Sequence, residues 1–248
     1  MKKLFFFLLV VLHITYSFSQ HTNILISDFD IPEEPAVAIN PKNTNEIMAG
    51  ANIDNYYYSQ DGGLSWSIGK LNSSYGVMGD PCIIVDTNER FYFLHLSDPS
   101  FGHWIDRIVC QRADSINGNW NNGSYTFLNG TKAQDKEWAI VDRNSNAIYV
   151  TWTQFDEYDS SNPLDSSIIL FSKSFDSGET WSTPKRLNKV AGDCLDSINT
   201  VEGATPAIGP DGEIYVSWAG PEGLLFDRSL DTGNTWLNDD IFVSNIPL

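Results

Sequence analysis

Short apolar runs, each closed by a turn residue, recur along the whole chain. Four of them end in Asn or Asp, at residues 35–40, 81–86, 137–142 and 206–211. A second apolar run follows each one, and residues 149–152 (YVTW) and 215–218 (YVSW) are near-copies of each other. Runs of this length between turn residues favour strands over helices. The pattern therefore predicts an all-β chain built from a repeated unit.

An eight-residue phrase, S-x-D-x-G-x-[ST]-W, stands between later runs at residues 59–66, 174–181 and 229–236. Its Asp can accept hydrogen bonds from backbone N–H groups of its own turn, and its Gly can adopt a left-handed conformation. The Ser or Thr hydroxyl can bond back to the Asp, and the Trp is expected to begin the next strand. We interpret the phrase as a structural hairpin turn, in preference to a ligand contact by the three Asp residues. The structural positions are Ser59, Asp61, Gly63, Trp66, Ser174, Asp176, Gly178, Trp181, Ser229, Asp231, Gly233 and Trp236.

These elements add up to four units of four strands each. Four-stranded antiparallel sheets repeated at this period are the blades of a β-propeller. We predict blades at about 35–71, 80–128, 136–188 and 205–245 within a domain of residues 20–248. The second unit lacks an intact phrase and keeps only Asp114, Gly118 and Trp120 around an insertion. Residues 23–27 are predicted to form a closing strand.

The repeated phrase resembles the Asp box, or bacterial neuraminidase (BNR) repeat, of β-propellers in the sialidase superfamily. The resemblance covers nearly all of the chain after residue 19. It implies that the phrases are turns on the face away from the active site, in a propeller of six or seven blades. Because only four units precede residue 248, the chain is expected to be truncated at its C-terminus.

The same resemblance implies a sialidase-like glycoside hydrolase, but one that departs from the usual pattern. Sialidases bind the sugar carboxylate with three arginines, the first of them in a Phe/Tyr-Arg-Ile-Pro motif. Residues 30–32 of this chain read Asp-Ile-Pro, and no Arg-Ile-Pro occurs in the sequence. The absence of this motif favours a non-catalytic propeller that binds a polysaccharide or a protein.

The N-terminus predicts export. A Lys pair, an apolar run and small residues at Ser17 and Ser19 form a signal peptide over residues 1–19. The run is too short for a comfortable membrane span, and the mature chain offers no other candidate. We therefore expect a secreted, periplasmic or cell-surface protein whose partner is an extracellular glycan or protein.

The charge of the chain narrows the range of partners. It has 32 acidic and 15 basic residues, for a formal net charge of −17. Nucleic acid is excluded as a partner, because phosphate binding needs a basic surface.

Cysteines and histidines predict no zinc site. The three cysteines form no C-x-x-C pair, and the four histidines lack metal-ligand spacing. Cys82 and Cys110 lie in apolar runs and are expected to be buried thiols. Cys194 lies in a polar loop and is expected to pair, if at all, beyond the end of this chain.

Acidic residues stand at the start of the first strand of each unit. They are Glu33, Glu34, Asp80, Asp135, Glu137 and Glu202. If the blades align, these carboxylates converge on one rim of the propeller, with Asp80 and Asp135 at equivalent places. Two such acids can hydrolyse a glycosidic bond, and a converging set can hold Ca²⁺. Solvated loop acids are the alternative.

We predict Asp80, Asp135 and Glu137 as catalytic residues, and Glu34 and Trp138 as ligand contacts. No cofactor is expected, apart from a calcium ion if the carboxylates bind one. Aromatic side chains either form a sugar-stacking surface or pack between blades; the tryptophans concerned are Trp104, Trp138, Trp152 and Trp218. Two functions stay open: a glycoside hydrolase acting on extracellular glycans, and a non-catalytic binding propeller.

Overall fold

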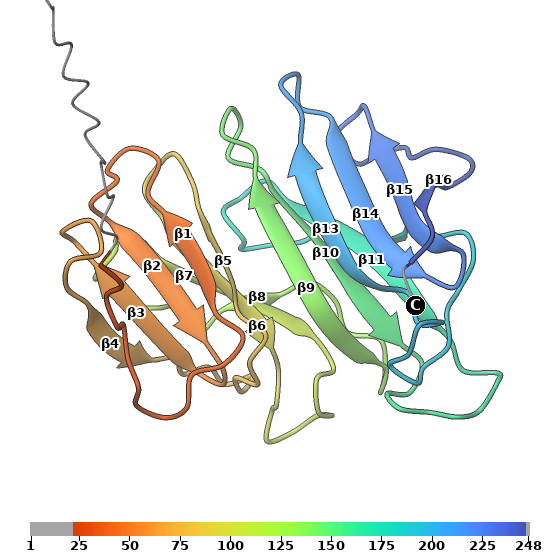
Figure 1. The fold of residues 1–248 in the computed structure, drawn as a ribbon, viewed down its shortest axis with the longest axis horizontal. Coiled ribbons are helices and arrows are strands. Elements are labelled where there is room, and N and C mark those ends of the chain that lie inside the picture. Colours follow the sequence, from red (N-terminus) through yellow and green to blue (C-terminus); the bar gives the residue numbers. More distant parts are fainter. Residues whose placement is uncertain (1–21, 247–248) are drawn as a thin grey trace, which may run out of the picture.

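The computed structural model describes residues 22–246, in which all regular structure is β. The predicted signal peptide therefore lies outside the described residues. Sixteen strands form four sheets of four, and each sheet is an antiparallel meander of consecutive strands (Figure 1). Within residues 22–246 no helix is long and apolar enough to cross a membrane.

The sheets follow one another along the chain. The first contains β1 (Ala36–Ile39), β2 (Ile47–Ala51), β3 (Asn55–Ser59) and β4 (Ser67–Lys70). The second contains β5 (Cys82–Val85), β6 (Phe91–Leu96), β7 (Ile108–Ala113) and β8 (Ser124–Tyr125). The third contains β9 (Ala133–Val141), β10 (Ile148–Phe155), β11 (Ser167–Ser174) and β12 (Lys185–Arg186). The fourth contains β13 (Glu202–Ile208), β14 (Ile214–Gly220), β15 (Gly223–Ser229) and β16 (Ile241–Ser244).

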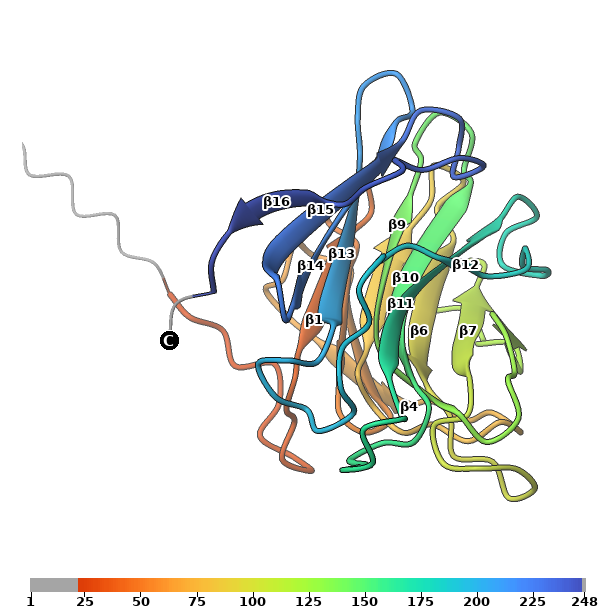
Figure 2. The same cartoon turned by 90° about the vertical axis from the view of Figure 1, so that its right-hand side faces the viewer.

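The first strand of each sheet is the innermost one. β5 packs between β1 and β9, and β9 packs against β13, so the four sheets stand side by side around a common axis (Figure 2). The predicted β-propeller of four-stranded antiparallel blades is confirmed. In Figure 1 β9 and β13 run in the same direction, and their first residues lie at one end of the molecule.

Some predicted boundaries are wrong. β9 begins at Ala133 and β13 at Glu202, ahead of the blade starts predicted at 136 and 205. In both cases the register shifts against the next strand, and this bulge lets pairing continue upstream. Residues 23–27 form no strand.

The Trp of the repeated phrase begins a strand in only one of the three sheets. β4 follows Trp66 directly, whereas β12 and β16 start several residues after Trp181 and Trp236. Proline or clustered Asn and Asp residues separate these two tryptophans from the strands. Such residues favour turns over continued pairing.

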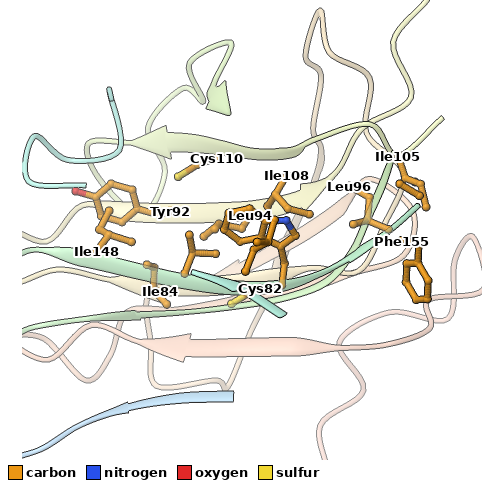
Figure 3. Packing of buried hydrophobic residues seen from close by; sticks show 14 of the residues in the cluster. Cys82, Ile84, Tyr92, Leu94, Leu96, Ile105, Ile108, Cys110, Ile148 and Phe155 are labelled. Atoms are coloured by element: carbon orange, nitrogen blue, oxygen red, sulfur yellow. The ribbon is translucent and has the colours of Figure 1, made fainter. Parts of the chain in front are cut away.

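Neighbouring sheets share hydrophobic cores. Figure 3 shows Cys82, Leu94 and Cys110 of the second sheet packed with Ile148 and Phe155 of the third. A second cluster joins the third and fourth sheets, and a third joins the first and second. Each sheet is therefore stabilised by the adjacent one.

The three cysteines are buried and unpaired in the structure. Burial of Cys82 and Cys110 in the core is confirmed. Cys194, which was expected in a polar loop, is also buried: its side chain is 1% exposed, and its backbone bridges to Ser160.

The repeated phrases form one turn with the same hydrogen bonds in three sheets. In the first, Ser59 Oγ donates to Asp61 Oδ1 at 2.8 Å and accepts from Gly63 N at 2.8 Å. Ser65 donates from its N to Asp61 Oδ1 at 2.9 Å and from its Oγ to Asp61 Oδ2 at 2.6 Å. The turns at Asp176 and Asp231 repeat all four bonds. These bonds lower the pKa of Asp61 to about 2.

The turns lie far from the start of the inner strands. Each follows the third strand of its sheet, and the first and third strands of an antiparallel meander end at the same edge. The acidic residues that precede the inner strands therefore lie at the opposite end of the molecule from the turns.

Candidate active site

Three neighbouring sheets begin with the same unusual backbone conformation. Glu34 lies before β1, Asp80 lies before β5, and Lys136 lies within β9, with φ of 49°, 52° and 50°. Left-handed conformations are rare for residues with side chains, and they concentrate at functional sites. Each sheet uses this conformation to place one charged side chain at the same end of the propeller.

Lys136 is the counterpart of Asp80 in the third sheet, so the prediction that Asp80 and Asp135 occupy equivalent places is wrong. The bulge in β9 displaces the chain by one residue, and Asp135 becomes part of the strand. The repeated sequence pattern does indicate that Lys136 corresponds to Glu34 and Asp80. The residues that directly precede Pro35, Pro81 and Glu137 are Glu34, Asp80 and Lys136.

These side chains line a cavity of about 260 Å³, the rim cavity. Its lining is Glu34, Pro35, Asp80, Pro81, Lys136, Glu137 and Trp138, which includes four of the five predicted site residues. The fifth, Asp135, lines a neighbouring cavity of about 160 Å³, the side cavity, together with Trp104 and Tyr158. The two cavities share Asp80 and Lys136.

Lys136 contacts the carboxyl groups of Glu34 and Asp80, and Asn52 connects the Glu34 carboxyl group to the backbone of Asp80. Lys136 Nζ lies 3.0 Å from Asp80 Oδ2 and 3.8 Å from Glu34 Oε1. The first contact is an ion pair without the alignment of a hydrogen bond. Asn52 Nδ2 donates to Glu34 Oε2 at 3.0 Å, and Asn52 Oδ1 accepts from Asp80 N at 2.8 Å. Asn52 follows β2, and nothing in the sequence pattern singled it out.

Glu34 and Asp80 have opposite pKa shifts. Burial, a hydrogen bond to Glu34 and the charge of Asp135 raise the pKa of Asp80 to about 7, although Lys136 opposes the change. The hydrogen bond with Asp80 lowers the pKa of Glu34, and Asn52 and Lys136 add to this effect. The opposite shifts favour one proton on the pair, with Asp80 the more readily protonated member.

Glu137 is a buried carboxyl group on the wall of the rim cavity. It is 3% exposed, and neither carboxyl oxygen has a hydrogen-bond partner among the described residues. Burial, with the nearby charges of Asp80 and Asp135, raises its pKa well above the usual value. A buried polar group without a partner is costly, and one at a cavity wall is typical of a functional site.

Further acidic groups surround the side cavity. Asp135 is 5% exposed, and burial raises its pKa. Burial, together with Asp135 and Asp196, raises the pKa of Glu202 to about 7. Tyr158 Oη lies 3.5 Å from Asp196 Oδ2, and burial followed by these carboxylates raises the pKa of Tyr158 to about 12. Tyr158 and Asp196 come from polar loops, and the sequence analysis assigned neither residue to the site.

The tryptophans divide into two groups. Trp138, on the rim cavity, is 46% exposed, and Trp104, on the side cavity, is 48% exposed. Trp152 and Trp218 are buried between sheets. Only the first two can offer a ring face to a ligand.

The charged groups of the rim cavity do not fit a metal ion. Among residues 22–246, no three His, Cys, Asp or Glu side chains are grouped to hold one. The ammonium of Lys136 stands between Glu34 and Asp80, where a cation would have to bind. The calcium ion that the sequence analysis allowed is therefore not assigned to the rim cavity, and no chemical step below depends on it.

Comparison with known proteins identifies the fold but no family. No family model and no curated protein matches the chain. Three solved structures illustrate the likeness, each aligned over 83% of this chain. A protein of unknown function from Dyadobacter fermentans DSM 18053 has a TM-score of 0.57, 16% identity and 67% of its own length covered.

The other two structures are enzymes. A thermostable family-43 glycoside hydrolase has a TM-score of 0.56, 15% identity and 71% of its length covered. A mutant Trypanosoma rangeli sialidase displaying trans-sialidase activity has a TM-score of 0.53, 16% identity and 37% of its length covered. The chain therefore spans little more than a third of the sialidase. At these identities the likeness is one of fold.

Proposed function

We propose that this protein is a glycoside hydrolase whose chemistry takes place in the rim cavity. One observation carries the proposal: a buried carboxyl group without a partner, Glu137, shares this cavity with Glu34 and Asp80, two carboxyl groups that Lys136 contacts. Glycoside hydrolysis uses two carboxyl groups with different pKa values. The group with the raised pKa acts as the acid, and the group that stays ionised acts as the base. The glycoside hydrolases among the structural neighbours support the same reading.

In the proposed mechanism Glu137 donates its proton to the glycosidic oxygen as the bond to the anomeric carbon breaks. The raised pKa of Glu137 keeps the proton available at neutral pH. The Glu34–Asp80 pair takes a proton from the water that attacks the anomeric carbon. Lys136 and Asn52 hold the pair in place, and the exposed ring of Trp138 supports the sugar.

The proposal extends to where the protein acts. The N-terminal Lys pair and apolar run support secretion, and an extracellular glycan as substrate. The three S-x-D-x-G turns and their repeated hydrogen bonds support placing the chain among the Asp-box propellers of the sialidase superfamily.

The test uses a panel of aryl glycosides with the purified protein. Glu137→Gln is expected to lower kcat by about 10²–10⁴-fold on nitrophenyl glycosides, the usual contribution of a general acid. The same variant should lose much less kcat on dinitrophenyl glycosides, because their leaving group needs no proton. Asp80→Asn should slow both substrates. Asp211→Asn, an exposed acid after β13 at the opposite end, is the matched control.

Unchanged melting temperatures are required for these comparisons. Turnover that survives in both cavity variants would refute the mechanism. Binding of a glycan without hydrolysis of any substrate would instead support the non-catalytic binding propeller, which the exposed rings of Trp104 and Trp138 favour.

A further inference from the structure

The charges of the rim cavity are already paired with one another. Its lining contains one cationic side chain, Lys136, and three carboxyl groups. Burial raises the pKa of Glu137 and so favours its neutral form, and the opposite pKa shifts of Glu34 and Asp80 favour one proton on that pair. The negative charge left on the pair is offset by Lys136, which contacts both of its members.

Lys136 is not free to bind an incoming anion. Burial disfavours its charge, but the contact with Asp80 and the charges of Asp80, Asp135 and Glu34 raise the pKa of the ammonium well above its usual value. A carboxylate on a ligand would have to compete with Asp80 at 3.0 Å and would be placed beside Glu34 and Asp80. Like charges at such distances repel strongly in a partly buried site.

The arginines of the described residues lie outside the lining of the rim cavity and of the side cavity. Arg107 forms two hydrogen bonds with Asp106, and its guanidinium stacks on Tyr75 and Tyr125. Arg112 binds Glu179 at 2.7 Å, and Arg143 lines a different cavity. Within residues 22–246, neither the rim cavity nor the side cavity is lined by an arginine, the side chain best suited to grip a carboxylate with two bonds.

We propose that the site binds an uncharged sugar and excludes sugars that carry a carboxylate, an inference that rests on the proposed function. The cavity is smaller than the roughly 300–1,000 Å³ of sites for drug-sized ligands, so we assign it to one sugar unit. Trp138 can cover an apolar sugar face, and Glu34, Asp80 and Glu137 can exchange hydrogen bonds with hydroxyl groups. A carboxylate would lose its hydration without gaining a free cation.

Binding measured apart from turnover tests this specificity. Titrations monitored by NMR would compare methyl glucoside with methyl glucuronide, and methyl galactoside with methyl galacturonide. For each neutral sugar that binds, we expect the matching uronide to have a Kd at least tenfold higher. A uronide, or a sialoside, that binds as tightly as the neutral sugar would overturn the inference. Neutral sugars that bind but are never hydrolysed would refute the proposed function and leave this inference standing.

A pair of neighbouring variants identifies the cause of the exclusion. Glu34→Gln removes one partner of Lys136, so the ammonium becomes available to a ligand carboxylate. The ratio of the Kd of the uronide to the Kd of the neutral sugar should therefore fall at least threefold. Glu33→Gln is the matched control, because Glu33 is exposed and lines another cavity. Both variants must keep the melting temperature of the parent protein. An equal ratio of Kd values in the two variants would contradict the role assigned to Lys136.

Discussion

At the residue scale, backbone conformation matters as much as side-chain chemistry. Glu34, Asp80 and Lys136 share the left-handed region although they differ in charge. The conformation costs about 1–3 kcal/mol at each position, and the surrounding sheets must supply that stability. The three side chains meet because their backbones turn in the same way, and burial together with their contacts shifts the pKa values of the carboxyl pair.

Glu202 should make the fold less stable at alkaline pH. Its pKa is about 7 in the folded protein, above the ordinary glutamate value of 4.5. Between these values the folded state binds more protons than the unfolded state, so stability falls as pH rises through this window. Glu202→Gln removes the group. We expect its Tm at pH 8 to rise by about 2–4 °C, the shift that 1 kcal/mol produces at this chain length.

The rise should vanish at pH 4, where Glu202 is largely protonated in both states. Glu222→Gln serves as the control, since Glu222 is exposed in the turn between β14 and β15 of the same sheet. A Tm gain of equal size at pH 4 and pH 8 would show that ionisation of Glu202 is not the cause.

At the element scale, the repeated turns of the third and fourth sheets connect each of these sheets to the one before it. Arg112 of the second sheet donates to Ser177 O and Glu179 in the third sheet's turn. Lys173 of the third sheet donates to Thr232 O in the fourth sheet's turn. The turn motif thus has a tertiary role beyond closing its own hairpin.

The turn glycines should differ in their tolerance of a side chain. Gly63 and Gly233 hold the same place in their turns, with φ of 88° and 78°. A Cβ on Gly233 would lie 2.4 Å from the ring of Phe171, whereas the nearest atom to one on Gly63 is Ile47 Cδ1 at 3.6 Å. Alanine at either position carries the left-handed strain of about 1–2 kcal/mol. Gly233→Ala should lose about 1–3 kcal/mol more through overpacking.

Denaturant unfolding of both alanine variants measures this difference. Gly63→Ala is the internal control, because it has the strain without the clash. Equal losses in the two variants would mean that the fourth turn does not depend on its contact with Phe171.

At the scale of the whole molecule, the sheets are coupled rather than independent. Thr151 of the third sheet donates to Ala204 O of the fourth at 2.6 Å, in addition to the core that these sheets share. An isolated blade would expose one of its apolar faces to water. Stability should therefore be lost in all four sheets together.

We expect a single cooperative transition in guanidinium. Far-UV circular dichroism reports all the strands, and tryptophan fluorescence samples every sheet, so the two midpoints should coincide. Two separated transitions, or probes with different midpoints, would show that some sheets unfold on their own.

The candidate site was only partly predictable from the sequence. Glu34, Asp80, Glu137 and Trp138 were found because each stands at the start of an inner strand, and strand order places these starts at one end. Asp135 was predicted to be the counterpart of Asp80, whereas Lys136 is the counterpart. The bulge in β9 causes this difference, and a bulge cannot be recognised from the pattern of apolar residues. Asn52 was missed, and Tyr158 and Asp196 were not assigned to the site, because they lie in loops without a repeat.

The sequence by itself determined the four-stranded sheets and their turns. Short apolar runs, and turns whose hydrogen bonds stay within five residues, are local features, so the sequence pattern alone predicts them. Only the tertiary structure decided which charges meet. The pairing of Lys136 with Asp80 and Glu34 joins residues about 50 to 100 positions apart and depends on a bulge, on left-handed backbone and on the packing of three sheets. The function proposed for this propeller rests on that long-range arrangement.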